Sequence, residues 1–98
     1  MPEMTVTVRW PDGTQDDCYS PSLVMHDHLT EGTTYTVAEF ADRAVAALSE
    51  ASARVQAKFG FACTSAAATA AKITDAAERY RADDPVHVVA MHPDLGDA

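Results

Sequence analysis

TVAEFADRAVAALSEASARVQAKFG, residues 36–60, is the stretch that decides how this chain folds. Thr36 and Glu39 have the spacing of a capping box, which predicts that a helix begins directly after Thr36. Gly60 stands where a left-handed residue commonly ends a helix. Between these two ends, apolar residues recur every three or four positions, so one side of this long helix is expected to face a core.

Patterns typical of strands occur both before and after this helix in the sequence. Residues 4–10 alternate apolar and polar side chains, which is typical of a half-buried strand. The turn signal at 11–13 leads into a second, weaker strand over 14–19. Residues 23–29 are interpreted as a short helix or an ordered loop, and 86–91 as a last, β-rich strand.

A second helix is predicted from residue 64 or 65 to about Arg81, and Pro85 prevents it from continuing. Only a few residues join the two helices, so they are expected to form an antiparallel hairpin. The predicted fold is α+β, an antiparallel three-stranded sheet covered on one face by the helical hairpin. Residues 30–34 are expected to form a polar connector into the long helix. Residues 1–92 are expected to form a single domain, and 93–98 a flexible tail.

The composition narrows the classes of function. The chain has 98 residues, 47% of them hydrophobic, and a formal net charge of -8 with only seven Lys and Arg residues. This balance argues against binding to nucleic acid or to an anionic membrane surface, because both need clustered cations. No apolar run approaches the roughly 20 residues of a membrane span, and the start has no secretory signal. We therefore expect a cytoplasmic protein whose two cysteines are thiols.

The first candidate for chemistry is the cysteine pair. Cys18 adjoins Tyr19 and Ser20 at the end of the second strand, and Cys63 precedes a helix N-terminus, where the helix dipole lowers a thiol pKa. If the hairpin folds back over the sheet, the two thiols approach each other. They are then either a redox or nucleophilic pair, or small hydrophobic core residues.

The second candidate is the His26-Asp27-His28 segment. With the cysteines, His26 and His28 would supply ligands that suit zinc. The spacing matches no established zinc pattern, and residues two apart on a helix point about 200° from each other. Exposed histidines are the favoured interpretation, and no metal or cofactor is expected.

The last strand predicts an interface. Period-two alternation places Val89 and Met91 on the face of the sheet that the helices leave open. Apolar side chains there need cover, which a second copy of the chain or a larger protein would supply.

Several strings in the sequence together resemble a known family. They are R-W-P-D-G at residues 9–13, C-Y-S-P-S at 18–22, the segment 35–40 and F-G-F-A-C at 59–63. The chain resembles the small nitrogen-starvation-response proteins of bacteria over roughly residues 1–91. That family is encoded around an aliphatic nitrilase, with a radical-SAM enzyme, an acetyltransferase and a flavin-dependent oxidoreductase. The resemblance includes both cysteines but neither His26 nor His28, and it implies a role in nitrogen acquisition without a known activity.

Two functions from different classes remain. The first is a non-catalytic accessory or interaction protein of a nitrogen-acquisition pathway linked to nitriles and nitrilase, which self-associates or docks onto a larger enzyme of the same gene cluster. The second is a small thiol-dependent enzyme or carrier that uses Cys18 with Cys63. The sequence favours the first, because no basic residue or histidine is placed by spacing to activate a thiol.

Overall fold

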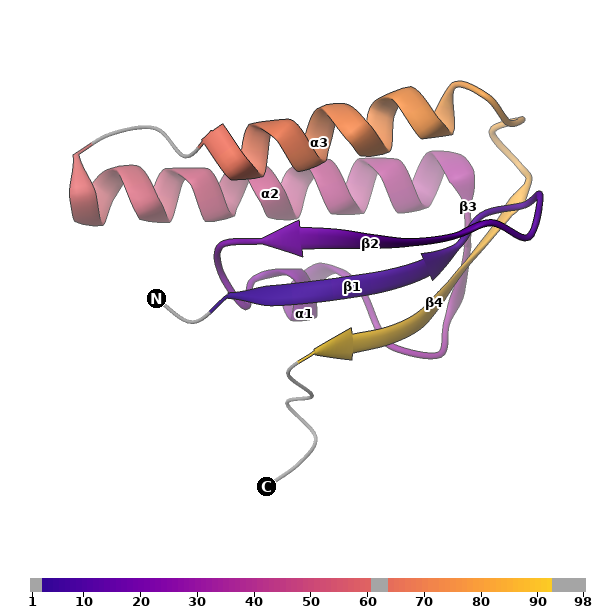
Figure 1. Ribbon diagram of the computed structural model, residues 1–98, viewed down its shortest axis with the longest axis horizontal. Helices are drawn as coiled ribbons and strands as arrows, with labels where there is room; N and C mark the ends of the chain where they lie inside the picture. The colour runs from indigo at the N-terminus through magenta and orange to yellow at the C-terminus, as the bar shows by residue number, and fades with distance from the viewer. Residues whose placement is uncertain (1–2, 61–63, 93–98) are drawn as a thin grey trace.

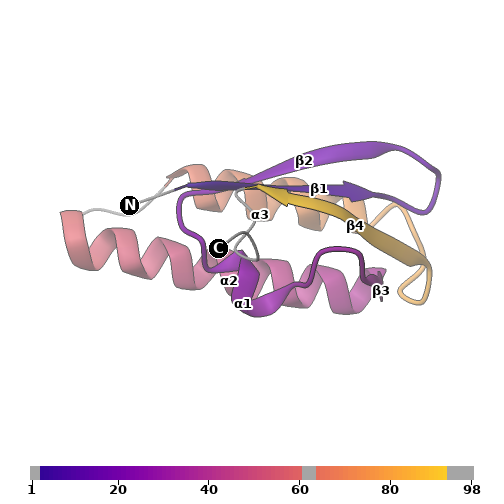
Figure 2. The same ribbon diagram turned by 90° about the horizontal axis from the view of Figure 1, so that it is seen from below.

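The computed structural model describes residues 3–60 and 64–92, and in this part of the chain it shows one antiparallel sheet and three helices (Figure 1). The long helices lie side by side on one face of the sheet (Figure 2). None of the described helices is long and apolar enough to cross a membrane. In chain order the elements are β1 (Met4–Arg9), β2 (Gln15–Ser20), α1 (Met25–His28), β3 (Thr34–Thr36), α2 (Val37–Phe59), α3 (Thr64–Ala77) and β4 (Pro85–His92).

The sheet has four strands in the order β2-β1-β4-β3, so the expected three-stranded sheet is wrong, although the α+β class holds. The additional strand is β3, which pairs antiparallel with β4 through Thr34 opposite His87 and Tyr35 opposite Val86. The sequence places Thr34 in the connector and Thr36 at the helix cap, because this strand is only three residues long and runs directly into α2. Thr and Tyr both favour strands, but the pairing partner lies some fifty residues away and is set by the tertiary fold.

The long helix begins and ends as the sequence predicts. The side chain of Thr36 accepts a hydrogen bond from the backbone N–H of Glu39 at 3.1 Å, and Gly60 closes α2 in the left-handed conformation, with φ 79°. The second helix ends at Ala77, earlier than the expected Arg81. The segment 23–29 contains only the four-residue helix α1.

A β-bulge changes which side chains of β4 face the core. Thr7 of β1 pairs with Ala90 and Val8 pairs with Val88, so Val89 is an additional residue in the ladder. A one-residue slip moves every later side chain to the opposite face. Met91 is consequently 1% exposed and belongs to the core, so the orientation expected for it is wrong.

The core lies between the sheet and the two long helices, and its aromatic centre is Trp10. The indole ring meets the Phe40 ring of α2 edge-on, with centroids 5.5 Å apart, and stacks on Tyr80 at 5.7 Å. Around these rings pack apolar side chains from both layers, including Met4, Val6, Val8, Ala44, Leu48, Ile73 and Val88. This single core fixes the helical hairpin against the sheet.

Candidate functional site

The candidates around the second strand do not converge on one site. Cys18 and Ser20 are both buried, on the side of β2 that faces the helices, whereas Tyr19 points to the open face and is 36% exposed. The Ser20 hydroxyl donates to the carbonyl of Ser22 at 2.8 Å and accepts from its N–H. The Tyr19 hydroxyl donates to Glu3 at 2.9 Å. Alternation along the strand therefore separates the three side chains.

The environment of Cys18 disfavours a thiolate. Burial, with smaller contributions from Asp16 and Asp17 that exceed the opposing effect of Lys72, raises the pKa of the Cys18 thiol to about 12. A nucleophilic cysteine needs the opposite shift, because the thiolate is the reactive form. Cys63 lies outside the described residues, so the expected approach of the two thiols stays a prediction.

Both histidines lie on α1, where His28 contacts a carboxylate of α2. His28 Nε2 lies 3.0 Å from an oxygen of Glu50 on α2, and this contact is the largest cause of the lowered pKa of Glu50. His26 lies on the same four-residue helix. Within residues 3–60 and 64–92, no three His, Cys, Asp or Glu side chains are arranged to hold a metal ion.

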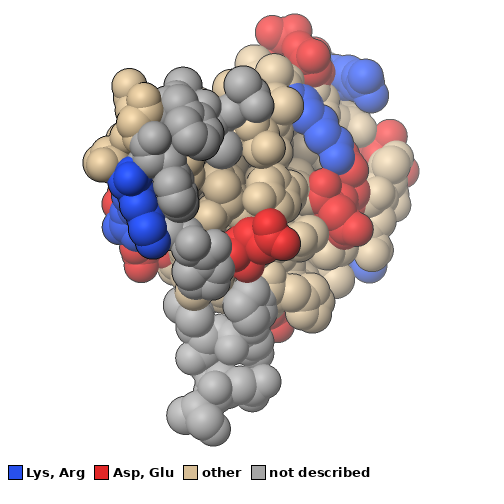
Figure 3. Space-filling model, turned by 60° about the vertical axis from the view of Figure 1, so that its left-hand side comes forward, with Lys and Arg blue, Asp and Glu red and all other residues tan. Residues whose placement is uncertain are grey.

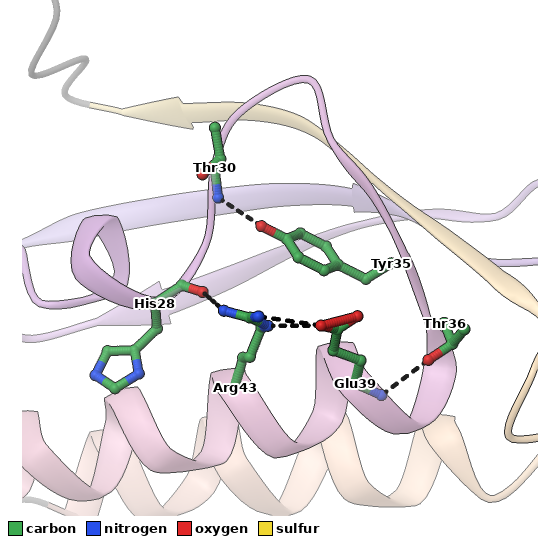
Figure 4. Close-up of polar contacts among 6 residues, drawn as sticks. All are labelled: His28, Thr30, Tyr35, Thr36, Glu39 and Arg43. Carbon is green, nitrogen blue, oxygen red and sulfur yellow. Dashed lines mark hydrogen bonds and ion pairs between the residues drawn. The ribbon is translucent and has the colours of Figure 1, made fainter.

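A polar network joins α1 and the following loop to α2 (Figure 4). Arg43 reaches from α2 to the carbonyl of His28 at 3.2 Å and pairs with Glu39 at 3.0 Å. Its guanidinium also lies over the ring of Tyr35, whose hydroxyl accepts the backbone N–H of Thr30. Each polar group in this network has a partner within the chain, so we assign the network to the positioning of the segment 25–36.

The open face of the sheet is mostly polar. Thr7 donates to Asp17 across β1 and β2 at 2.8 Å, and the contact between Tyr19 and Glu3 lies on the same face. Of the two residues expected to form an interface, Val89 is half-buried at the bulge and Met91 is in the core. The support for self-association through this face is therefore reduced to Val89, and self-association stays a prediction.

A larger concave surface lies on the opposite side of the molecule, between α2 and α3. It is an open groove of about 810 Å³, and no strand residue lines it. We call it the helical groove. Most of its lining side chains are small or apolar and include Val37, Ala38, Ala41, Val45, Ala46 and Ala77.

The charged side chains that line the helical groove are both acidic. Asp42 comes from α2 and Glu78 from the residues after α3, and neither has an ion pair among the described residues. Elsewhere the two signs of charge are mixed: on the face in Figure 3, Lys and Arg stand apart from one another among Asp and Glu. The groove therefore combines an apolar floor with a purely negative rim.

Sequence reasoning missed this groove although its residues were visible. The predicted apolar stripe of the long helix was assigned to the core through Phe40, Ala44 and Leu48, which are indeed buried. Beside it runs a second stripe of spacing four, Ala38, Asp42 and Ala46, which is exposed. A run of alanines on the outer side of a predicted helical hairpin was the available signal.

The fold and this surface define a small two-layer α+β protein with an acidic, apolar groove on its helical face. The chain belongs to the family of the nitrogen starvation-induced protein NitG, whose family model matches residues 5–91. No curated protein and no solved structure matches the chain. The match confirms the family expected from the sequence, and it does not extend to the nitrilase gene cluster.

Proposed function

We propose that this member of the nitrogen starvation-induced family is a non-catalytic accessory protein that binds a helical segment of a partner protein in the helical groove. The helical groove is the observation that carries the proposal, because it is open and lined mostly by small or apolar side chains. Exposed apolar surface rimmed by polar side chains is typical of interaction sites. The small side chains of Ala41 and Ala46 leave room for a third helix to approach both α2 and its neighbour.

The dimensions of the groove suit a helix. The 14 residues of α3 span about 21 Å at ~1.5 Å per residue. A second depression, lined by Leu48, Ala66 and Ala70, shares Val45 and Ser49 with the groove and extends it toward the turn between the helices. An amphipathic helix of roughly four turns would lay apolar anchors at i, i+3 or i+4, and i+7 along this surface.

The charges of the helical groove indicate which charge the residues beside the apolar anchors of the bound helix should carry. Asp42 and Glu78 face a bound segment from opposite sides, and both lack a cationic partner within the described chain. Lys or Arg beside the apolar anchors would pair with them, and acidic flanks would be repelled. The partner segment is therefore a basic amphipathic helix.

A second copy of the chain is a poorer occupant of the groove. Each copy carries a formal net charge of -8, and two grooves placed face to face would bring Asp42 and Glu78 of one copy against the same residues of the other. Like charges across an interface oppose association. The groove thus favours a different protein over self-association.

The state of Cys18 supports the non-catalytic part of the proposal. A thiol held protonated in the core is a poor nucleophile, and Tyr19 and Ser20 are directed to different sides of β2. We further propose that the partner is a larger enzyme of the nitrogen-acquisition pathway, for which a nitrilase-centred gene cluster is the expected setting. The cytoplasmic location expected from the sequence stays a prediction.

The direct experiment is a nuclear magnetic resonance titration of the isotope-labelled full chain with synthetic peptides. One amphipathic peptide of roughly 15 residues has leucine anchors flanked by lysines, and a second has the same anchors flanked by glutamates. We expect saturable shifts at Ala41, Val45 and Ala77 with the first peptide. Replacing Asp42 and Glu78 by lysine should weaken this binding roughly tenfold, because two exposed ion pairs become repulsive.

The matched control is Asp75→Lys, an exposed acidic position on α3 that does not line the helical groove. It should leave the affinity for the lysine-flanked peptide within about twofold. Equal binding of both peptides, or shifts confined to the open face of the sheet, would overturn the proposal. Sedimentation of the free protein as a dimer whose interface maps to Ala41 and Val45 would assign the groove to a second copy instead.

A further inference from the structure

A smaller hollow lies at the end of the sheet, where β1 leads into the turn before β2. Its volume is about 360 Å³. Its wall contains three polar side chains from adjacent strands, which are Arg9 in β1, His87 in β4 and Thr34 in β3. We call it the sheet hollow.

The strand register brings these three side chains to one face. His87 lies opposite Arg9 in one antiparallel ladder and opposite Thr34 in the other, and directly opposed residues point to the same side of a sheet. The Thr34 hydroxyl and His87 Nδ1 are 2.9 Å apart. When the hydroxyl donates to Nδ1, the neutral imidazole carries its proton on Nε2, which is then a further N–H donor.

The electrostatics of the sheet hollow are opposite to those of the chain as a whole. The sequence has 15 acidic residues against seven Lys and Arg, yet no carboxylate lines this hollow. Arg9 has no ion pair among the described residues. The adjacent turn contains Asp12, whose carboxylate accepts the backbone N–H of Thr14 at 2.9 Å. The hollow is therefore an isolated cationic spot with several donors.

The remaining walls are apolar. Pro11 and Pro85 line the sheet hollow together with Trp10, which is only 4% exposed. Its indole ring packs in the core against Phe40 and Tyr80, so the two prolines supply the apolar surface that the sheet hollow exposes.

We propose that the sheet hollow binds a monocarboxylate, with the carboxylate on Arg9 and a short apolar body against Pro11 and Pro85. A guanidinium matches the geometry of a carboxylate and binds it through two parallel hydrogen bonds. One full positive charge balances a monoanion, whereas a phosphate carries more negative charge than this site neutralises. The imidazole of His87 and the Thr34 hydroxyl add uncharged donors beside the anion.

The test uses butyrate as the probe, with its neutral isostere butyramide and inorganic phosphate as comparison ligands. In a nuclear magnetic resonance titration of the isotope-labelled chain, we expect butyrate to shift the amide signals of Gly13, Thr34 and His87 saturably, with a Kd of about 1–10 mM for so small a fragment. Butyramide and phosphate should bind at least about tenfold more weakly.

Two arginine variants make the test specific. Arg9→Gln removes the charge at an exposed position and should weaken butyrate binding about tenfold or more, the worth of one charged hydrogen-bonded pair. Arg81→Gln removes an exposed arginine that does not line the sheet hollow and should leave the affinity unchanged.

Three results would overturn the proposal. These are the absence of a saturable shift up to roughly 100 mM butyrate, ten times the weakest expected Kd, equal binding of butyramide, and equal loss of affinity in Arg9→Gln and Arg81→Gln. Stronger binding of phosphate than of butyrate would likewise contradict it, because the site would then accept a higher charge than Arg9 balances.

Discussion

The two outer faces of this protein differ in ways that its composition does not reveal. On the helical face, the helical groove has small apolar walls and two carboxylates, Asp42 and Glu78, without cationic partners in the described part of the chain. At the end of the sheet, the sheet hollow has an arginine without an ion pair and no lining carboxylate, as far as residues 3–60 and 64–92 show. Both are open to solvent, yet one is suited to a basic helix and the other to a small anion.

The difference shows that the net charge of a chain does not fix the charge of its sites. A formal charge of -8 argues against nucleic acid as a partner, but it leaves room for a local cationic spot such as Arg9 with His87. The sign of each site depends on which side chains adjacent strands or helices bring together. Each of the following measurements tests one side of this comparison, beginning with the largest expected effect.

Lysine substitutions on β4 test which residues face the helices. Met91→Lys places a charge in the core and should destabilise the fold by about 3 kcal/mol or more, because the charge has no partner there. Val89→Lys, at the half-buried bulge, should cost much less. Urea denaturation of both variants makes the comparison. Equal midpoints for the two would mean that the bulge, and with it the polar character of the open face, is wrongly assigned.

The alkaline limb of the stability curve tests the burial of Cys18. Its pKa is raised to about 12 in the folded protein, whereas an unfolded thiol ionises near 8.5. Above that pH the unfolded chain loses the proton first, so stability should fall by up to about 1.4 kcal/mol per pH unit. The fall relative to Cys18→Ala, measured from pH 8 to 10, isolates this contribution. Parallel curves for the two proteins would show that the thiol is accessible and able to ionise.

The smallest expected change in stability is that of replacing Thr36, which is the last residue of β3 and the N-cap of α2. Thr36→Ala removes the side-chain acceptor for the N–H of Glu39 and should cost about 1 kcal/mol, as losses of N-caps typically do. Thr30→Ala is the control, because the hydroxyl of this exposed threonine makes no hydrogen bond among the described residues. If both variants unfold at the same urea concentration as the parent, the start of α2 is set by something other than its cap.

Local signals in the sequence account for much of the fold. The capping box at Thr36, the terminal Gly60 and the alternation of 4–10 all act through neighbouring residues, and each predicted its element. The strand β3 was missed because three residues carry too weak a local signal, and only pairing with β4 makes them a strand. The bulge at Val89 was missed for a related reason, since the alternation within one strand does not reveal an additional residue in the ladder.

The candidate sites were harder to predict than the elements. Sequence reasoning selected reactive residue types such as Cys18, His26 and His28, but burial or pairing within the chain accounts for the positions of Cys18 and His28. The two concave surfaces depend on distances between elements: the helical groove on the separation of α2 and α3, and the sheet hollow on the meeting of three strands and a turn. Residue types and spacing contain no direct record of such distances.

The central claim is that the helical groove is the docking surface, and one pair of variants tests it most directly. Ala46→Arg fills the groove from an exposed position of α2, and Ala53→Arg places the same side chain on the same helix outside the groove. Titrations of both with the lysine-flanked peptide give the answer. We predict that Ala46→Arg weakens binding about tenfold or more and that Ala53→Arg leaves it within about twofold. Equal affinities for the two variants would contradict the account.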